Sequence, residues 1–403
     1  MSNHAEMLQW IDAQHGRMRG LVERWASVNS WTHNLAGLAT LATQLESDFA
    51  ILGGEVTLRD LPPQEAIDAR GNLTFTPLGK AISIVKRPDA PVRVFLGIHY
   101  DTVYPPDDPF QSVDAPDAFT LRGPGVIDAK GGLAVLLIAL EALERSDVGD
   151  RIGWEVLLNP DEEVGSPGSA ALLAGCAARN QVGLVFEPAF PDGSLVSERK
   201  GSGNFAAVIR GRSAHAGRDP AAGRNAVVAA ADFALAAHGL NGRVPEATVN
   251  VGRIDGGGPV NVVPDLAIVR FNARAAQIAD QHLIEQELQR IAAEVINRHE
   301  VAVQLDGGFL SPPKLLDDRT RDLCRLIESC GQALDIPIRW TRSGGVSDGN
   351  KLAAAGLPVI DTLGPVGGHL HSPHEYLRLN TLTERARLCA LLLLRLAAGE
   401  ASL

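Results

Sequence analysis

Acidic and imidazole side chains follow directly on three apolar runs of this chain. The runs and the residues after them are Val92–Gly97 with His99 and Asp101, Trp154–Leu158 with Glu162 and Glu163, and Val182–Phe186 with Glu187. Continuous apolar runs of this length indicate buried strands of a largely parallel sheet, and open α/β sheets carry ligand sites at the carboxyl ends of such strands. Imidazole and carboxylate groups together favour zinc over magnesium or calcium. The sequence therefore predicts a metal site at one edge of a sheet.

The spacing inside two of these groups predicts separate tasks for neighbouring residues. Alternation along an extended backbone puts His99 and Asp101 on the same side, so the imidazole could bind a metal while the carboxylate holds it from behind. Adjacent Glu162 and Glu163 in extended chain point in opposite directions, which leaves one carboxylate as a ligand and the other free as a base. Two bound dications would need several carboxylates for charge balance, and the strand ends supply them.

The elements that must position these residues alternate between strands and helices. Lys130–Arg145 carries apolar residues at helical spacing between the first two strands, as in an α/β layer. From about Lys200 the pattern changes to an antiparallel sheet with two helices, and after Pro313 the α/β pattern resumes. The later elements that we expect are strands Asn204–Arg210, Thr248–Ile254 and Leu266–Ala273, a strand closing the insert, strand Gly356–Asp361, and helices Gly223–His238, Gln277–His299, Asp317–Ala333 and Thr383–Ala398.

The length of 403 residues is too great for one simple core and predicts two domains. We expect an α/β catalytic domain formed by residues 1–199 and 312–403. Residues 200–311 would form a compact α+β domain inserted into it.

Composition excludes several classes of function. A net charge of −11 without a basic stripe argues against nucleic-acid binding, and no run of about 18 apolar residues is present to cross a membrane. Met1–Ser30 is expected to form an amphipathic helix rather than an export signal. The four cysteines are scattered without a Cys-x-x-Cys pair, which predicts reduced thiols rather than disulfides or a thiolate zinc cluster. These features together favour a soluble cytoplasmic protein.

Five motifs occur in the order found in a known enzyme family. They are His99-Tyr100-Asp101, Gly123–Gly132 with Asp128 inside it, Asp161-Glu162-Glu163, Glu187-Pro188, and His371-Ser372-Pro373-His374-Glu375. The chain resembles the co-catalytic zinc exopeptidases and deacylases, which include acetylornithine deacetylase, succinyl-diaminopimelate desuccinylase, aminoacylase and glutamate carboxypeptidase. Its pattern is nearest to the glutamate carboxypeptidase branch. Gly211–Gly217 and Asn261–Pro264 resemble the lid-domain motifs of this family.

The resemblance implies a fold and a cofactor. The fold is an α/β catalytic domain with a parallel-rich mixed sheet and an inserted α+β, ferredoxin-like domain that serves as lid and dimerisation domain of a homodimer. The cofactor is two Zn²⁺ per subunit, with Co²⁺ or Mn²⁺ as alternatives. Asp128 would bridge the two metals, with His99 and Glu187 at one site and Glu163 and His371 at the other.

The resemblance also implies roles for residues around the metals. Glu162 would be the general base, with Asp101 orienting His99. His215 would reach from the partner subunit to stabilise an oxyanion. The substrate contacts that the resemblance implies are Asn261, Arg274 and Gly345, the last in the loop Gly344–Asn350.

Two positions depart from the family pattern. The acidic residue usual two positions before the lid arginine is here Asn272. Asp306-Gly307-Gly308-Phe309 offers no basic residue where the folate-cleaving branch has a further arginine, so the resemblance does not extend to glutamate specificity.

The function that we expect is cleavage of the amide bond of a peptidyl or N-acyl amino acid, by a carboxypeptidase of the glutamate carboxypeptidase type. A deacylase of N-acyl amino acids and a di- or tripeptidase are the alternatives among enzymes. A catalytically silent metal-binding scaffold would have lost the base or a ligand, and none is missing. A dinucleotide-binding loop starting at Gly123 would need glycine where Asp128 stands.

Single residues leave further alternatives open. His369 or His374 could replace His371 as the ligand, although the spacing to Glu375 favours His371. His215 could merely bond the backbone of its own turn, and Arg274 could be a surface ion-pair partner.

Overall fold

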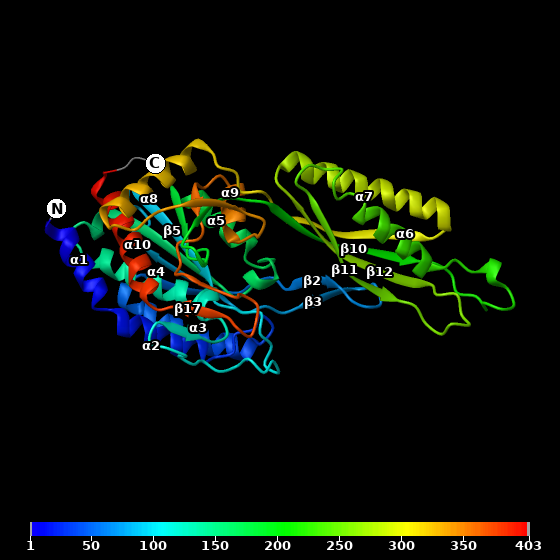
Figure 1. The fold of residues 1–403 in the computed structure, drawn as a ribbon, viewed down its shortest axis with the longest axis horizontal. Coiled ribbons are helices and arrows are strands. Elements are labelled where there is room, and N and C mark those ends of the chain that lie inside the picture. The colour runs from blue at the N-terminus through cyan, green and yellow to red at the C-terminus, as the bar shows by residue number, and fades with distance from the viewer. Residues whose placement is uncertain (1, 401–403) are drawn as a thin grey trace.

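A computed structural model describes residues 2–400 of the chain. The backbone forms a larger and a smaller body, which lie end to end along the longest axis of the molecule (Figure 1). The larger body contains α1 (Ser2–Asp12) and α10 (Asn380–Ala398), which contact each other near the two chain ends.

A six-stranded sheet forms the centre of the larger body. Its strands, in spatial order, are β1 (Glu55–Arg59), β4 (Ala81–Lys86), β7 (Ile152–Asn159), β5 (Val92–His99), β8 (Val182–Val185) and β15 (Val359–Ile360). The last four run parallel, whereas β1 and β4 pair antiparallel with each other and β4 pairs antiparallel with β7. The parallel-rich mixed sheet expected from the sequence is therefore confirmed.

Helices cover both faces of this sheet because its strands are apolar on both sides. In β5, Val94 and Leu96 face one core and Phe95 faces the other. The helices on the first side are α1, α2 (His15–Ala26), α3 (Leu35–Phe49), α4 (Gly132–Glu144), α8 (Asp318–Ala333) and α10, and those on the second side are α5 (Ala170–Arg179) and α9 (Asp348–Ala354).

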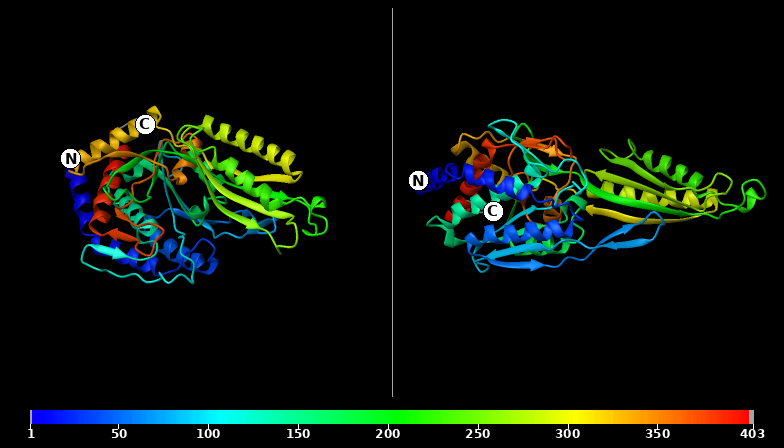
Figure 2. Two further views of the ribbon diagram at one scale, coloured as in Figure 1. Left: turned by 45° about the vertical axis from the view of Figure 1, so that its right-hand side comes forward. Right: turned by 90° about the horizontal axis from the view of Figure 1, so that it is seen from below.

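A four-stranded antiparallel sheet forms the smaller body (Figure 2). Its strands, in spatial order, are β11 (Thr248–Gly256), β12 (Leu266–Ala275), β10 (Gly201–Arg210) and β13 (Ala302–Ser311). Helices α6 (Ala226–His238) and α7 (Ile278–His299) pack on one face around Phe205, Phe233 and Phe271. This is the two-helix, antiparallel pattern expected for the insert, while the limits 200–311 remain a prediction.

A hairpin of the larger body reaches the other face of this four-stranded sheet. It consists of β2 (Gln64–Ile67) and β3 (Leu73–Thr76), and Ile67 packs against Val208 and Ile268. The remaining elements are short: β6 (Thr120–Arg122), β9 (Leu195–Arg199), β14 (Trp340–Ser343), β16 (Gly367–Gly368), β17 (Tyr376–Arg378), η1 (Ala50–Leu52), η2 (Val126–Gly131), η3 (Gly149–Arg151), η4 (Glu162–Val164) and η5 (Pro220–Ala222).

Some expected elements have different limits. Residues 2–26 form two helices rather than one, since the chain turns between α1 and α2. Helix α6 begins at Ala226, because the side chain of Asn225 accepts the backbone N–H of Val227 and Val228 as an N-cap. The strand expected from Gly356 is limited to β15, since Gly356 has φ +86° and belongs to the turn after α9.

In the described part of the chain, no helix combines the length and apolar character that a membrane span requires.

Candidate functional site

The carboxyl edge of the parallel strands collects the residues predicted for metal binding. His99 is the last residue of β5 and lies opposite Asn159, the last residue of β7. Glu187 follows β8 by two residues, and η4 carries Glu162 and Glu163 just after β7. Parallel register brings these strand ends together, as the alternation of elements predicted.

Asp128 is brought to this edge by the start of α4. It lies in the turn η2, directly before a helix that is buried on all sides. A Cβ on Gly132 would lie 2.1 Å from the carbonyl oxygen of Phe186, so only glycine lets α4 approach the end of β8 this closely. The glycines of this motif therefore place Asp128 beside Glu187.

Asp128 faces a different histidine with each carboxylate oxygen. Its Oδ1 lies 3.0 Å from Nε2 of His99, and its Oδ2 lies 3.4 Å from Nε2 of His371. Each imidazole nitrogen also faces one glutamate: His99 lies 3.7 Å from Oε2 of Glu187, and His371 lies 3.2 Å from Oε2 of Glu163. Ligand atoms of His99, Asp128 and Glu163 lie within 4.8 Å of one another. The five side chains thus form two sets that share Asp128.

His371 lies on the open side of this cluster, because its side chain is 55% exposed whereas that of His99 is 1% exposed. The alternatives His369 and His374 face each other, with ring centroids 6.3 Å apart, and neither forms an ion pair with the described residues. This geometry favours His371 over its two neighbours as a partner of the carboxylates.

Asp101 lies behind His99 and makes more contacts than expected. Nδ1 of His99 lies 3.2 Å from Oδ1 of Asp101, as the alternation predicted, and also 3.2 Å from the backbone oxygen of Asp101, with which it forms a hydrogen bond. The carboxylate of Asp101 also accepts the backbone N–H of Glu162 at 3.2 Å and of Glu163 at 3.3 Å, and the hydroxyl of Thr32 at 2.6 Å. Asp101 therefore holds both the imidazole and the turn that carries the two glutamates.

The expectation of extended backbone at Glu162 and Glu163 is wrong. The two residues open the 3-10 turn η4. The physical reason is local: a turn directs two successive N–H groups at the buried carboxylate of Asp101, which an extended strand end would not do. The turn still separates the two glutamates, since the carboxylate of Glu163 faces His371 and that of Glu162 does not ion-pair with it.

Three further residues support the cluster and were not assigned roles from the sequence. Glu375 is fully buried and accepts the backbone N–H of Ile127 and Asp128 at 3.1 and 3.2 Å, while Tyr104 donates its hydroxyl to Glu375 at 2.7 Å. Lys130 donates its ammonium to the backbone oxygen of Tyr100 at 2.9 Å. Glu375 and Lys130 belong to the quoted motifs, but nothing in the sequence indicated which backbone groups they would bind.

Burial raises the pKa of the three glutamates in this cluster, whereas His371 and His99 outweigh burial at Asp128 and lower its pKa. The pKa of Glu162 is well above its usual value, first because of burial and then because of Glu187. Burial and Asp128 raise the pKa of Glu163 to about 7. Hydrogen bonds to Asp128 and Glu163 raise the pKa of His371 to about 11. The cluster thus concentrates like charges that its two histidines balance only in part.

The donor set fits two divalent metal ions. Buried carboxylates need positive charge, and imidazole with carboxylate is a ligand combination of zinc and related metals. The Oε1 atom of Glu187 is buried without a hydrogen-bond partner among the described residues, as expected for an oxygen reserved for an ion.

Arg274 and Gly345 lie together at the junction of the two bodies. Arg274 is near the end of β12, and its Nη1 donates to the backbone oxygen of Gly344. The backbone oxygen of Gly345 accepts a hydrogen bond from Nη1 of Arg199 at 3.1 Å. Arg274 forms no ion pair with residues 2–400, so it is not the surface ion-pair partner that was left open.

His215 and Asn261 lie elsewhere: His215 pairs with Val262 beyond Arg210, at the end of β10 opposite to the one that pairs with Arg274. His215 follows the distal end of β10, a strand of ten residues that spans about 30 Å. The backbone N–H of Ala216 donates to the backbone oxygen of Asn261 at 3.0 Å, and Nδ1 of His215 accepts the backbone N–H of Gly217 at 3.1 Å. Within one chain the structure therefore does not bring these two residues to the metal cluster or to Arg274.

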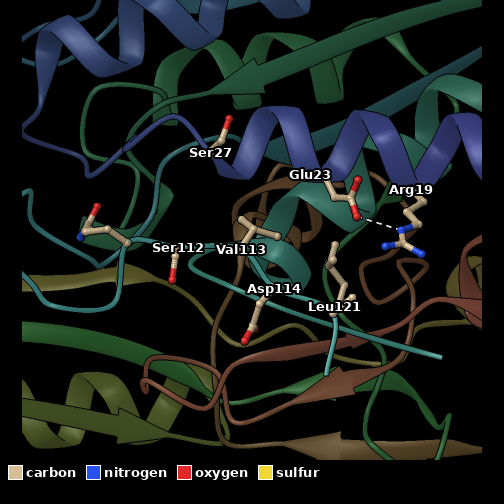
Figure 3. Close-up of a pocket in the computed structure, with 9 residues that line it drawn as sticks. Arg19, Glu23, Ser27, Ser112, Val113, Asp114 and Leu121 are labelled. Carbon is tan, nitrogen blue, oxygen red and sulfur yellow. Dashed lines mark hydrogen bonds and ion pairs between the residues drawn. The ribbon is translucent and has the colours of Figure 1, made fainter. Parts of the chain in front are cut away.

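A surface pocket of about 410 Å³ lies beside α2, away from these residues (Figure 3). Arg19 and Glu23 line it from α2 and Ser27 from the C-cap of this helix, whereas Ser112 and Asp114 line it from the facing loop. Arg19 pairs with Glu23 at 2.8 Å across an exposed helix surface. No predicted site residue lines this pocket.

Known proteins are similar to this chain in sequence and in fold. Residues 95–395 match the family model described as Peptidase family M20/M25/M40. Carboxypeptidase G2 of Pseudomonas sp. (strain RS-16) is 28% identical over 396 residues, which cover 94% of this chain and 89% of that protein. A succinyl-diaminopimelate desuccinylase of Pseudomonas syringae pv. syringae (strain B728a) is 30% identical over 319 residues, 73% of this chain and 81% of that protein.

The fold is also similar to that of a solved structure. The crystal structure of the Bacillus subtilis YxeP protein, a dinuclear metal-binding peptidase of the M20 family, superimposes with a TM-score of 0.67 at 15% sequence identity. The superposition covers 96% of this chain and 99% of that chain.

Proposed function

Because the chain belongs to peptidase family M20/M25/M40, we propose that it is a two-metal carboxypeptidase of the glutamate carboxypeptidase type. The family assignment by itself makes the chain a metallohydrolase of peptides or acyl amino acids. The finer proposal concerns the substrate, the metal and the role of each residue.

One observation carries the proposal: the two oxygens of Asp128 face His99 and His371, and each of these histidines faces its own glutamate. In this arrangement Asp128 would be shared by two zinc ions, with His99 and Glu187 holding one ion and Glu163 and His371 holding the other. When bound, the two ions act as Lewis acids that polarise the scissile carbonyl and lower the pKa of water.

The protein's own groups supply the proton transfer and the orientation. Glu162 accepts a proton from the attacking water and returns it to the leaving amine. Asp101 keeps the imidazole of His99 in one tautomer and holds the turn that carries Glu162. Arg274 binds the free carboxylate beside the scissile amide, with Gly345 lining the same pocket.

A second copy of the chain completes the site in this proposal. His215 and Asn261 lie far from the cluster of their own chain, and strand β11 presents a free edge at the side of the four-stranded sheet. Large apolar side chains are exposed around this edge, namely Val228, Leu235, Ile254, Val260 and Val262. A dimer formed over this surface would bury them and bring His215 to the partner's metal cluster as an oxyanion donor.

The free cysteines support a reducing compartment, and we propose the cytoplasm. All four are buried and unpaired.

The second candidate is a deacylase of N-acyl amino acids. It is favoured by the desuccinylase relative, whose identity to this chain equals or exceeds that of the carboxypeptidase. Both candidates need a carboxylate next to the scissile amide, and the groups on the other side of the amide distinguish them.

The test is hydrolysis of a panel of peptidyl and N-acyl amino acids by protein that has been stripped with a chelator and titrated with zinc, cobalt or manganese. We expect activity to return near two metals per chain and to be lost in Glu162→Ala, with the panel choosing between carboxypeptidase and deacylase. Metal binding at that stoichiometry without turnover would favour a silent scaffold. A chain that binds no metal would refute the proposal.

A further inference from the structure

The guanidinium of Arg274 is held by a neutral partner. Asn272 and Arg274 are two residues apart in β12 and therefore point to the same face. Nε of Arg274 donates to Oδ1 of Asn272 at 3.1 Å, and Nη1 donates to the backbone oxygen of Gly344. Both acceptors are uncharged.

The amide of Asn272 can present only its oxygen to Arg274. Its Nδ2 faces acceptors on the neighbouring strand β10: Oγ of Ser202 at 2.9 Å, the backbone oxygen of Gly203 at 3.0 Å, and Oδ1 of Asn204 at 2.9 Å. The opposite orientation would set N–H against N–H at Arg274 and oxygen against oxygen at Gly203. The strand register, with Asn204 opposite Asn272, thus fixes how Arg274 is held.

No carboxylate of the described residues therefore balances the positive charge of Arg274. It forms no ion pair within the part of the chain that the structure describes, whereas Arg270 on the same strand pairs with Asp255 at 3.0 Å. An arginine that is oriented but not neutralised is suited to bind an anion, because the substrate does not have to displace a carboxylate of the protein.

We propose that Asn272 strengthens the preference for acid-terminated substrates, since it orients Arg274 without placing a negative charge beside it. This inference rests on the proposed function. Asparagine at this position selects substrates with a free carboxylate beside the scissile amide over their neutral carboxamides. An aspartate here would bind Nε of Arg274 as a charged partner and would compete with the carboxylate of the substrate.

The test compares Asn272→Asp with Asn272→Ala in the metal-loaded enzyme. Both variants lose the amide donors to β10, but only the aspartate adds a charge. For the best acid substrate of the panel we expect KM to rise about tenfold more in Asn272→Asp than in Asn272→Ala, with kcat changed less than about twofold. For the carboxamide of the same substrate the two variants should agree. The difference should shrink in high salt.

A second variant provides an independent test in case a substitution at Asn272 disturbs folding. Asn204 is exposed, and Asn204→Asp keeps the acceptor for Asn272 while placing a charge one residue further from Arg274. We expect a smaller rise of KM in the same direction, about twofold to threefold. Equal KM values in Asn272→Asp and Asn272→Ala, or equal losses on acid and carboxamide, would overturn the inference.

Failure of the proposed function would be recognised separately. If the wild-type enzyme cleaves no amide, calorimetric binding of the free acid and of its carboxamide replaces KM as the readout. Weaker binding of the acid to Asn272→Asp than to Asn272→Ala would then still support the role of Asn272, and equal binding would refute it.

Discussion

Asp101 connects more of the site than its place behind one imidazole implies. Its carboxylate contacts the ring of His99, the hydroxyl of Thr32 and two successive backbone N–H groups of the turn η4. A fully buried carboxylate with this many donors is rigid, because each lost bond would leave a polar group unpaired. His99, the proposed metal ligand, and Glu162, the proposed base, are therefore positioned by one residue.

We expect Asp101→Asn to lower both metal affinity and kcat/KM by about 10-fold to 100-fold. The asparagine amide has one N–H₂ group that must face donors, and because each oxygen of Asp101 accepts one N–H of the turn η4, the turn loses an acceptor in either orientation. Metal affinity is measured by competition with a chelator, beside the activity. Thr32→Val is the control, since it removes one hydrogen bond and leaves the carboxylate. Wild-type values in Asp101→Asn would contradict the positioning role.

At the scale of the secondary-structure elements, three chain segments meet in a buried ion cluster. Arg199 ends β9, Lys314 lies just after β13, and Asp361 follows β15. Asp361 lies 2.7 Å from Nε of Arg199 and 2.9 Å from Nζ of Lys314, and all three side chains are buried. Because Arg199 also donates to Gly345, this cluster links the sheet of the larger body to the loop beside Arg274.

Asp361→Asn should lower the free energy of unfolding by about 3 to 5 kcal/mol at pH 7, because two buried cations lose their partner. Burial alone would raise the pKa of Asp361, but Arg199 and Lys314 outweigh it and lower the pKa to about 2. A lowered pKa stabilises the fold above the usual pKa of aspartate, and this contribution is lost as the pH falls toward 2.

Urea unfolding of wild type and Asp361→Asn at pH 7 and at pH 3 measures this effect. The difference in the free energy of unfolding between the two proteins should be smaller at pH 3. The exposed ion pair of Asp114 with Arg122 serves as the control, and Asp114→Asn should change stability little. A difference that is independent of pH would show that the carboxylate charge is not what stabilises the cluster.

A second prediction at this scale concerns the contact between α4 and β8. A Cβ in Gly132→Ala would overlap the carbonyl oxygen of Phe186, so α4 must move away from the strand. We expect a loss of about 1 to 3 kcal/mol in stability together with weaker metal binding, since Asp128 and Glu187 move apart. Thermal unfolding and chelator competition test it.

Gly16→Ala is the matched control, because a Cβ on this helical glycine of α2 would meet no atom within 4 Å. It should stabilise the protein by about 0.5 to 1 kcal/mol. Metal affinity that is unchanged in Gly132→Ala would show that the approach of α4 to β8 does not set the distance between Asp128 and Glu187.

At the scale of the whole molecule, the two bodies contact each other at their junction and also through the hairpin β2–β3. Nη2 of Arg210 donates to the backbone oxygen of Gly71 at 2.9 Å, and Nη2 of Arg270 donates to that of Asp68 at 2.9 Å. The hairpin β2–β3 thus fastens the larger body to the open face of the four-stranded sheet. His215 follows Arg210, at the end of β10 opposite to the one that pairs with Arg274, so the proposed shared site needs a second chain.

Complementation tests this shared site. Glu162→Ala and His215→Ala should each be nearly inactive alone. In a re-equilibrated equal mixture, half of the dimers are mixed and each has one intact site, so activity should return to about a quarter of the wild-type value. Light scattering verifies the dimer. Two variants that stay inactive in verified mixed dimers would contradict a site that combines Glu162 of one chain with His215 of the other.

The sequence by itself indicated the parallel strands around the site and the residues at their ends, but not β1, β4, α3, α5 or α9. Apolar runs and helical spacing are local properties, so β5, β7, β8 and α4 could be predicted within a few residues. The ordered motifs likewise named the side chains that converge. This prediction succeeded because the chain must leave a buried strand at the edge of the sheet, where polar side chains are tolerated.

Only the tertiary structure decided how these side chains meet. The pairing of Asp128 with two histidines depends on the crossing of α4 over β8 and on a loop that returns from the other end of the chain. The turn at Glu162 depends on a carboxylate contributed by another strand, and the separation of His215 from Arg274 depends on the direction of β10 and β12. Contacts between distant segments follow from packing and register, which no local pattern encodes.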